Sequence, residues 1–294
     1  MENLDSPKGW FFMVIGIVAV LAAILSAVIC MGAGAFGSLA WLWMLPAGFL
    51  GSFLGIMLLA FLFVLVLCAF VDLDKVQEQD NKLYRAVTYM IADAAHTVLQ
   101  VRVQAEGLEK VPTDGRVLLV CNHLNNADPV ILYHQLKKKQ KLAFIAKREV
   151  GNMFVVGKLM HKMLCQRLNR ENDREALKTI LKCIEIIKAD KASIAVFPEG
   201  GILGGNVLHP FRGGVFKIAL RTKVPIVVCT LWGTQDVFHN GLRLKPTDVQ
   251  FHVLGVVEPE AYQGMTAVEL GHMVHDMMAK DLGPDRVLFV EETP

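Results

Sequence analysis

The sequence predicts an α/β domain with a mostly parallel sheet, preceded by a hairpin of two membrane-spanning helices. No Lys, Arg, Asp or Glu occurs between Gly9 and Val71, a stretch long enough for two helical bilayer crossings. After Val71, short apolar segments alternate with amphipathic ones, which is the pattern of strands and helices around a parallel sheet. We therefore expect a transmembrane hairpin at 1–71, a linker helix at 72–100 and the α/β domain at 101–294.

Two apolar runs form the predicted hairpin. Trp10–Met31 and Leu42–Phe70 each exceed the roughly 20 residues that cross a bilayer as a helix, and the Gly-rich segment 32–40 suits a turn between them. Pro46 is expected to kink the second span or to mark its start. A cleaved signal peptide is the alternative for the first span, because Ala33-Gly34-Ala35 resembles a cleavage site. Even then the second span would hold the following domain at a membrane.

The charges that flank the hairpin predict its orientation. Lys8 precedes the first span, Lys75, Lys82 and Arg85 follow the second, and the turn carries no positive charge. The positive-inside rule then places both ends of the hairpin in the cytoplasm. We expect an integral protein of the cell membrane with its α/β domain on the cytoplasmic face. The six cysteines, expected to be free thiols, fit such a reducing compartment.

The elements after the hairpin follow from periodicity. The linker helix, expected at 76–99, carries Leu83, Val87 and Met90 on one side. The predicted strands are short apolar runs bounded by turn residues: 101–104, 117–121, 142–145, 194–197, 226–231 and 249–256. The predicted helices have apolar residues three and four apart: 129–138, 153–163, 173–189, 214–222 and 267–280.

A His/Asp pair follows the second predicted strand. His123 comes directly after 117–121 and Asn122, and Asp128 stands five residues later, before Pro129. A carboxylate that holds one imidazole nitrogen leaves the other as a base near neutral pH. Such a pair could deprotonate an alcohol for attack on a thioester. Taken alone, Asp128 also fits a helix N-cap, and His123 also fits a loop histidine with a local hydrogen bond.

Phe197-Pro198-Glu199-Gly200 ends the strand expected at 194–197. If this strand neighbours 117–121, Glu199 faces the same cleft as His123, because the carboxyl ends of parallel strands meet at one edge. A turn accounts for the Pro and Gly equally well. The run 200–205 lacks Gly-Lys-Ser/Thr, so it is not a nucleotide phosphate loop.

The net charge and the spacing of the cysteines and histidines argue against nucleic-acid binding and against a metal site. With 30 Lys+Arg against 28 Asp+Glu the net charge is +2, which gives no electrostatic ground for nucleic-acid binding. The cysteines form no C-x-x-C pair and the histidines show no ligand spacing, so no metal site is expected. Lys137-Lys138-Lys139 could attract anionic head groups or form a solvated helix end.

Four short motifs occur in a characteristic order. They are N-H-x4-D at 122–128, Lys-x-Glu at 147–149 running on to Arg170, F-P-E-G at 197–200 and V-P-I at 224–226. In this order they resemble the glycerolipid acyltransferase family, which includes the 1-acylglycerol-3-phosphate acyltransferases. The segment 211–214 also looks like the family's sequence after F-P-E-G. The resemblance covers about 101–256.

The resemblance implies a glycerolipid-acyltransferase-like α/β fold that uses no cofactor and takes acyl-CoA or acyl-carrier protein as the acyl donor. It implies that His123 is the catalytic base and Asp128 its orienting partner. It also implies an acceptor site, with Arg170 meeting the acceptor's phosphate. The residues expected to bind substrate are Lys147, Arg170, Glu199, Gly200 and Arg212.

The chain departs from the family pattern beside F-P-E-G. Many members continue with Thr-Arg, whose guanidinium helps to bind phosphate, whereas Gly201 and Ile202 stand here. A bidentate phosphate contact from that position is therefore absent. Arg212 or Lys217 are the candidates to replace it. The second proline of the family's V-P-I-x-P motif is also replaced, by Val228 or Cys229 in this chain.

We interpret the chain as a membrane-bound O-acyltransferase that acylates 1-acyl-glycerol-3-phosphate to phosphatidate, with membrane lipids as partners. Another lyso-lipid or glycerol-3-phosphate is the alternative acceptor. A hydrolase with His123 and Asp128 as metal ligands, and a non-catalytic lipid-binding membrane protein, are the alternatives of other classes. Cys121, close to His123, is expected to be a strand-core thiol rather than a nucleophile. The sequence leaves the oligomeric state open.

Overall fold

The computed structural model describes residues 7–169 and 172–288. It divides the chain into two compact units, Met1–Asp72 and Leu73–Pro294. The boundary coincides with the change in composition from a charge-free apolar stretch to ordinary globular sequence. Helix α3, expected as a linker, belongs to the second unit.

The first unit is a helical hairpin. Helix α1 (Pro7–Gly32) and helix α2 (Trp41–Ala69) are joined by a turn that contains the 3-10 helix η1 (Ala35–Gly37). The segment Phe12–Gly32 and the whole of α2 are long and apolar enough to cross a membrane. Pro46 is the sixth residue of α2, so the expectation that it marks the start of this helix is wrong. A proline at this position has no N–H to donate to the Leu42 carbonyl, so α2 lacks one intrahelical hydrogen bond there.

The two helices of the hairpin approach closely at one polar contact. The Ser26 hydroxyl donates a hydrogen bond to the Leu45 carbonyl over 2.6 Å. A Cβ atom at Gly48 would lie only 2.7 Å from that hydroxyl oxygen. Any side chain at Gly48 would therefore displace the Ser26 hydroxyl, and glycine is common where apolar helices pack closely.

A seven-stranded sheet forms the centre of the second unit, in the order β1-β7-β6-β2-β5-β3-β4. Its strands are β1 (Val101–Glu106), β2 (Leu118–Cys121), β3 (Leu142–Lys147), β4 (Gln166–Leu168), β5 (Ser193–Val196), β6 (Ile226–Trp232) and β7 (Thr247–Val257). All neighbouring pairs are parallel except β6 and β7, which are antiparallel. The predicted α/β class with a mostly parallel sheet is confirmed, and β1 and β7 run against the other five strands.

Strand β2 lies at the middle of the sheet. Leu118 is opposite Ile226 of β6 on one side and Ile194 of β5 on the other. Every residue of β2 and β5 is buried, which explains why these strands are continuous apolar runs in the sequence. Because β2 and β5 are parallel neighbours, the segments that follow them emerge at the same edge of the sheet.

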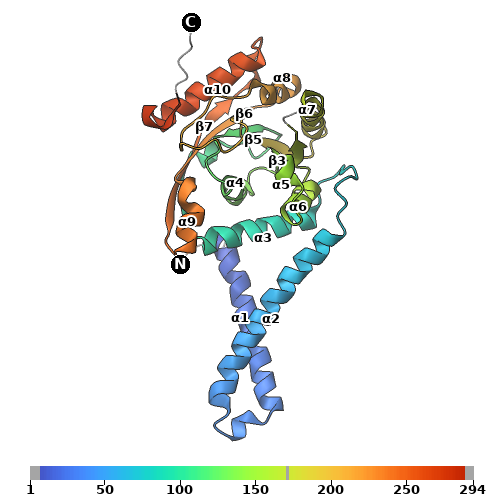
Figure 1. Cartoon of the computed structure of the whole chain (residues 1–294), viewed down its shortest axis with the longest axis vertical. Helices are drawn as coiled ribbons and strands as arrows, with labels where there is room; N and C mark the ends of the chain where they lie inside the picture. The colour runs from blue at the N-terminus through green and yellow to red at the C-terminus, as the bar shows by residue number, and fades with distance from the viewer. Residues whose placement is uncertain (1–6, 170–171, 289–294) are drawn as a thin grey trace. The chain divides into compact units, whose positions relative to one another are not determined.

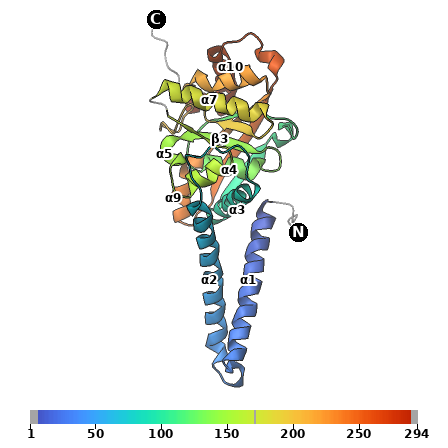
Figure 2. The ribbon, with the colours of Figure 1, turned by 90° about the vertical axis from the view of Figure 1, so that its right-hand side faces the viewer.

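Helices cover both faces of the sheet. In two perpendicular views α7, α8 and α10 lie on one side of it, and α3, α4 and α6 lie on the other (Figures 1 and 2). Their bounds are α3 (Lys82–Val98), α4 (Asp128–Leu136), α5 (Arg148–Gly151), α6 (Val156–Lys162), α7 (Asp173–Lys188), α8 (Lys217–Thr222), α9 (Val237–Leu242) and α10 (Ala267–Leu282). The layer of α3, α4 and α6 is the one that borders the candidate site.

Helix ends differ from the expected ones where side chains cap them. Asn81 accepts hydrogen bonds from the backbone N–H groups of Leu83 and Tyr84, so α3 begins at Lys82 rather than at residue 76. The helix expected at 214–222 is a 3-10 turn followed by α8. The sequence reasoning missed β4, α5 and α9, which are too short to show a periodic pattern.

Candidate active site

The loop between β2 and α4 brings His123 and Asp128 together. His123 Nδ1 lies 2.8 Å from Asp128 Oδ2. The same carboxylate oxygen accepts hydrogen bonds from the backbone N–H groups of Leu124, over 2.7 Å, and Asn125, over 2.9 Å. Asp128 is fully buried. Since a carboxylate only accepts hydrogen bonds, Nδ1 carries the proton and the lone pair of Nε2 remains for proton transfer.

Asp128 does not cap helix α4. The N-cap residue is Ala127, no side-chain cap bond is formed, and Asp128 is the first residue of the helix. Its carboxylate points back into the loop and accepts hydrogen bonds from the backbone N–H groups of Leu124 and Asn125, which precede the helix. The alternative of a simple N-cap is therefore wrong, because all three hydrogen bonds of Asp128 orient the loop that carries His123.

Two neighbouring contacts fix the loop and the imidazole plane. Asn122, fully buried, donates to the Leu231 carbonyl over 2.8 Å and accepts from the Leu231 N–H over 2.7 Å, which ties the loop to β6. The His123 ring stacks on Phe197, with centroids 4.1 Å apart and planes at 14°. The sequence reasoning assigned no role to Asn122, although a polar residue at the end of a buried strand was a signal for one.

Glu199 lies beneath the same loop. Its Oε1 accepts from the His123 backbone N–H over 2.7 Å, and its Oε2 accepts from the His209 N–H over 3.0 Å. Only 2% of Glu199 is exposed. Burial raises the pKa of Glu199 to about 7, although the bonds from His209 and His123 act in the opposite direction. The carboxylate thus holds two backbone segments together and positions His123.

His123 stands on the wall of a cavity of about 530 Å³. The lining is largely apolar and comes from α3, α4, β3, α6 and the F-P-E-G loop. It includes Ile91, Val130, Tyr133, Phe144, Ile145, Leu159, Met160, Met163, Phe197 and Ile202. A cavity of this size with a largely apolar lining is typical of sites that bind apolar small molecules. The His123 imidazole and the Lys147 side chain are the basic groups among its lining residues.

Some of the expected substrate-binding residues line this cavity and others do not. Gly200 and Lys147 line it, and Lys147 is exposed at the end of β3. Arg212 is exposed on the segment beside F-P-E-G, where its backbone N–H donates to the Pro198 carbonyl over 2.9 Å. Arg170 lies outside the described residues.

The Cys121 thiol and the side chains that could bind a metal ion are the remaining reactive groups to consider. Cys121 is fully buried, and burial raises its pKa well above the usual value, with Cys229 and Asp128 adding to the effect. A thiol in this state is a poor nucleophile. Within residues 7–169 and 172–288, no three His, Cys, Asp or Glu side chains gather as metal ligands.

The raised pKa of Glu199 predicts a pH-dependent stability. Its folded pKa of about 7 lies above its ordinary value of 4.5. Protonation of Glu199 in the folded state therefore contributes about 3 kcal/mol to the free energy of unfolding below pH 4.5, and this contribution is lost as pH rises through 7. Glu199→Gln cannot titrate. We expect the melting temperature of wild type minus that of Glu199→Gln, in detergent, to fall by several degrees between pH 5 and 8. A difference that is independent of pH would show that Glu199 does not titrate there.

Comparison with known protein families identifies the segment that carries these residues. The model of the Acyltransferase family matches residues 102–232. This segment runs from β1 to the end of β6 and contains His123, Asp128 and Glu199. The resemblance to glycerolipid acyltransferases is confirmed.

Curated relatives of the chain include proteins named as 1-acyl-sn-glycerol-3-phosphate acyltransferases. The chain is 33% identical over 141 residues to the chloroplastic 1-acyl-sn-glycerol-3-phosphate acyltransferase of Brassica napus, which covers 48% of this chain and 40% of the relative. It is 31% identical over 173 residues to a probable 1-acyl-sn-glycerol-3-phosphate acyltransferase of Mycoplasma pneumoniae, covering 58% of this chain and 62% of the relative. The chain thus spans about half the length of these relatives.

A solved structure shares the fold. The crystal structure of PlsC, the 1-acyl-sn-glycerophosphate acyltransferase of Thermotoga maritima, aligns with 75% of this chain and 86% of its own, with a TM-score of 0.54 and 21% identity. The likeness shows a shared fold over the aligned part of the two chains.

Proposed function

We propose that this acyltransferase-family domain transfers an acyl chain from a thioester donor to the free hydroxyl of a lysophospholipid, with 1-acyl-glycerol-3-phosphate as acceptor and phosphatidate as product. The observation that carries the proposal is the position of His123. Its Nδ1 is held by a buried carboxylate, and its ring lies on the wall of an apolar cavity. A base at the edge of a hydrocarbon-binding space is what acylation of a lipid hydroxyl requires.

The arrangement accounts for each proton in the transfer. His123 Nε2 takes the proton of the acceptor hydroxyl as its oxygen attacks the thioester carbonyl carbon. Asp128 stabilises the imidazolium that forms, because its charge lies 2.8 Å from Nδ1. When the tetrahedral intermediate collapses, the carbon–sulfur bond breaks and the imidazolium returns the proton to the thiolate. An ester and a free thiol result, and no acyl-enzyme intermediate is needed.

The acyl donor and the membrane anchor complete the proposed function. The donor is acyl-CoA or acyl-carrier protein, used as a co-substrate, and no cofactor takes part. The hairpin α1–α2 anchors the protein in the cell membrane, with the α/β unit on the cytoplasmic face. Support comes from the apolar length of both helices and from the lysines and the arginine that flank them.

An assay of the purified full chain in detergent tests the proposal. The donors are acyl-CoA and acyl-carrier protein, and the acceptors are lysophosphatidate, other lysophospholipids and glycerol-3-phosphate. We expect ester formation with lysophosphatidate and equimolar release of thiol. Release of fatty acid without ester, or loss of turnover with a chelator, would instead favour a hydrolase.

The acceptor's phosphate is expected to contact Arg170 or Arg212. A charge-assisted hydrogen bond contributes roughly 1.5–3 kcal/mol. Arg170→Ala, or else Arg212→Ala, should therefore lower kcat/KM for lysophosphatidate by about ten- to a hundredfold. Monoacylglycerol, which lacks the phosphate, should be much less affected.

Arg221→Ala is the matched control for the phosphate test. Arg221 is another exposed arginine, on α8, and we expect its removal to leave both acceptors unchanged. Equal losses on the two acceptors with Arg170→Ala and Arg212→Ala would show that these arginines are structural, and would point to a lipid of another head group.

A further inference from the structure

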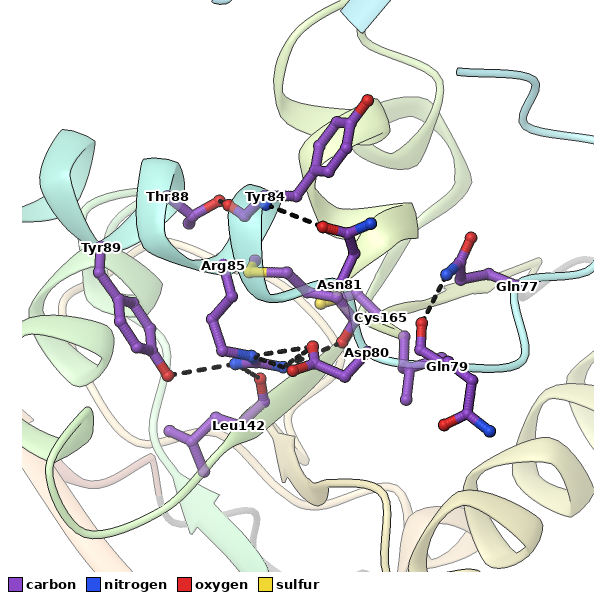
Figure 3. A network of polar contacts seen from close by, with 12 residues as sticks. Gln77, Gln79, Asp80, Asn81, Tyr84, Arg85, Thr88, Tyr89, Leu142 and Cys165 are labelled. Atoms are coloured by element: carbon purple, nitrogen blue, oxygen red, sulfur yellow. Dashed lines mark hydrogen bonds and ion pairs between the residues drawn. The ribbon is translucent and has the colours of Figure 1, made fainter. Parts of the chain in front are cut away.

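A buried arginine on α3 links three parts of the chain. Arg85 Nε donates to both carboxylate oxygens of Asp80, over 2.8 and 2.9 Å, and Nη2 donates to Asp80 Oδ1 over 2.7 Å. Nη1 donates to the Tyr89 hydroxyl over 3.2 Å and to the Leu142 carbonyl over 3.0 Å. Nη2 also donates to the Met163 carbonyl over 3.3 Å. Figure 3 shows the guanidinium between Asp80 and Tyr89, with the Leu142 carbonyl below it.

The pair of Arg85 and Asp80 is held in a nearly dry site. The exposed fractions of their side chains are 6% and 11%. Burial lowers the pKa of Arg85, but the hydrogen bonds and charges of Asp80 and Tyr89 outweigh this effect and leave the pKa above its usual value. The guanidinium therefore stays charged. Its planar set of donors lets a single side chain hold a carboxylate, a phenol and two carbonyls at fixed angles.

The groups that Arg85 holds stand directly behind the cavity. Met163 lines the cavity, and its own carbonyl accepts from Arg85. Leu142 begins β3, the strand that supplies Phe144 to the lining. Thr88 also lines the cavity and lies three residues after Arg85, on the same face of α3. One side chain thus sets the spacing between α3, β3 and the end of α6.

The exposure of the lining residues shows which end of the cavity Arg85 supports. Met163, Phe144 and Tyr133 are 0%, 3% and 6% exposed, whereas Ile91 and Ile202 are each 42% exposed. The first three therefore form the buried end of the cavity, and the last two form its exposed end. Tyr133 and Phe144 are also tied to Cys165, through its sulfur at 3.5 Å from the Tyr133 hydroxyl and 3.2 Å from the Phe144 N–H.

We propose that the Arg85–Asp80 pair is a positioning device that holds the closed end of this cavity in place and thereby limits the length of the acyl chain that the enzyme accepts from its donor. The inference rests on the proposed acyl transfer, because the chain whose carbonyl reacts beside His123 extends from there into the cavity. Arg85 does not touch the substrate. It acts through Met163, Phe144 and Thr88, whose backbone positions decide where the hydrocarbon ends.

Arg85→Met tests this limit, because methionine is unbranched like arginine but forms none of these hydrogen bonds. The measurement is kcat/KM for saturated acyl-CoA donors from C10 to C20 with the full chain in detergent. A site can discriminate by about tenfold or more for a methylene that does not fit. We expect the wild type to show a sharp upper limit. Arg85→Met should raise that limit by two or more carbons, with kcat for the shortest accepted donor within about threefold of wild type.

Two variants separate positioning from general stability. Arg85→Lys keeps the charge and is expected to give an intermediate limit, because lysine cannot hold both carbonyls and the carboxylate. Arg116→Met is the matched control. Arg116 pairs with Asp190 over 2.8 Å and donates to the Asp190 carbonyl over 2.9 Å, and neither residue lines the cavity. The chain-length profile of Arg116→Met should equal that of wild type.

The outcomes are distinct. A loss of kcat/KM that is equal for all chain lengths in Arg85→Met would overturn the proposal, because the pair would then be merely structural. If Arg85→Met does not fold, Asp80→Asn loosens the same pair and must raise the limit. If even the wild type transfers no acyl group, the proposed function fails. Calorimetric binding of non-reactive S-alkyl-CoA thioethers of the same lengths then decides the length limit by itself.

Discussion

Asp128→Asn is expected to lower kcat for acyl transfer by about 10²–10⁴-fold without a large change in melting temperature. The amide oxygen of asparagine can still accept from the backbone N–H groups of Leu124 and Asn125, so the loop keeps its path. It brings no charge to the imidazolium, however, and its NH2 group favours the wrong tautomer of His123. Steady-state turnover with saturating donor and acceptor measures the effect.

A second His/Asp pair in the same unit supplies the matched control. His252 Nδ1 lies 3.1 Å from Asp281, and neither residue borders the apolar cavity. Asp281→Asn should change kcat by less than about twofold. His123→Ala should be at least as inactive as Asp128→Asn, and the double variant should lose little more, because the two residues act as a unit. Full turnover by Asp128→Asn would disprove the dyad.

Removal of residues 1–72 is expected to lower turnover on vesicle-embedded acceptor by about 10²-fold, because a membrane tether raises the local concentration of enzyme at its substrate by factors of this order. The remaining unit, Leu73–Pro294, has its own sheet and core, so it should stay folded by circular dichroism. Turnover on a short-chain acceptor dispersed as monomers should be within a few-fold of the full chain. The comparison of the two acceptors is the measurement.

An unrelated transmembrane helix, fused before Leu73, is the control for the truncation. If α1–α2 serve only as an anchor, this fusion should restore most of the turnover on vesicles. Normal turnover on vesicles by the truncated protein itself would show that the hairpin is dispensable. Loss on the monomeric acceptor as well would show that residues 1–72 support the fold of the α/β unit.

The proximity of His123 and Glu199 could be predicted from the sequence, but the contact between them could not. Both residues follow buried apolar strands, and we expected them in one cleft if those strands were neighbours. Strands β2 and β5 are neighbours, and the Glu199 carboxylate lies 2.7 Å from the His123 N–H. Sequence reasoning placed Glu199 among the acceptor-binding residues. Its burial and its two backbone partners also give it a positioning role, which only the folded contacts reveal.

The sequence by itself determined what depends on composition and on spacing over a few residues. The absence of charge between Gly9 and Val71 was sufficient to place two apolar helices, and the five-residue spacing of His123 and Asp128 was sufficient for one loop to join them. The tertiary structure decided what depends on contacts between distant segments. The reversed direction of β7, the cavity beside His123 and the link from Arg85 to Leu142 and Met163 are of this kind. A hydrogen bond between residues 57 or 78 positions apart leaves no periodic trace in the chain, because it forms only when packing brings those segments together.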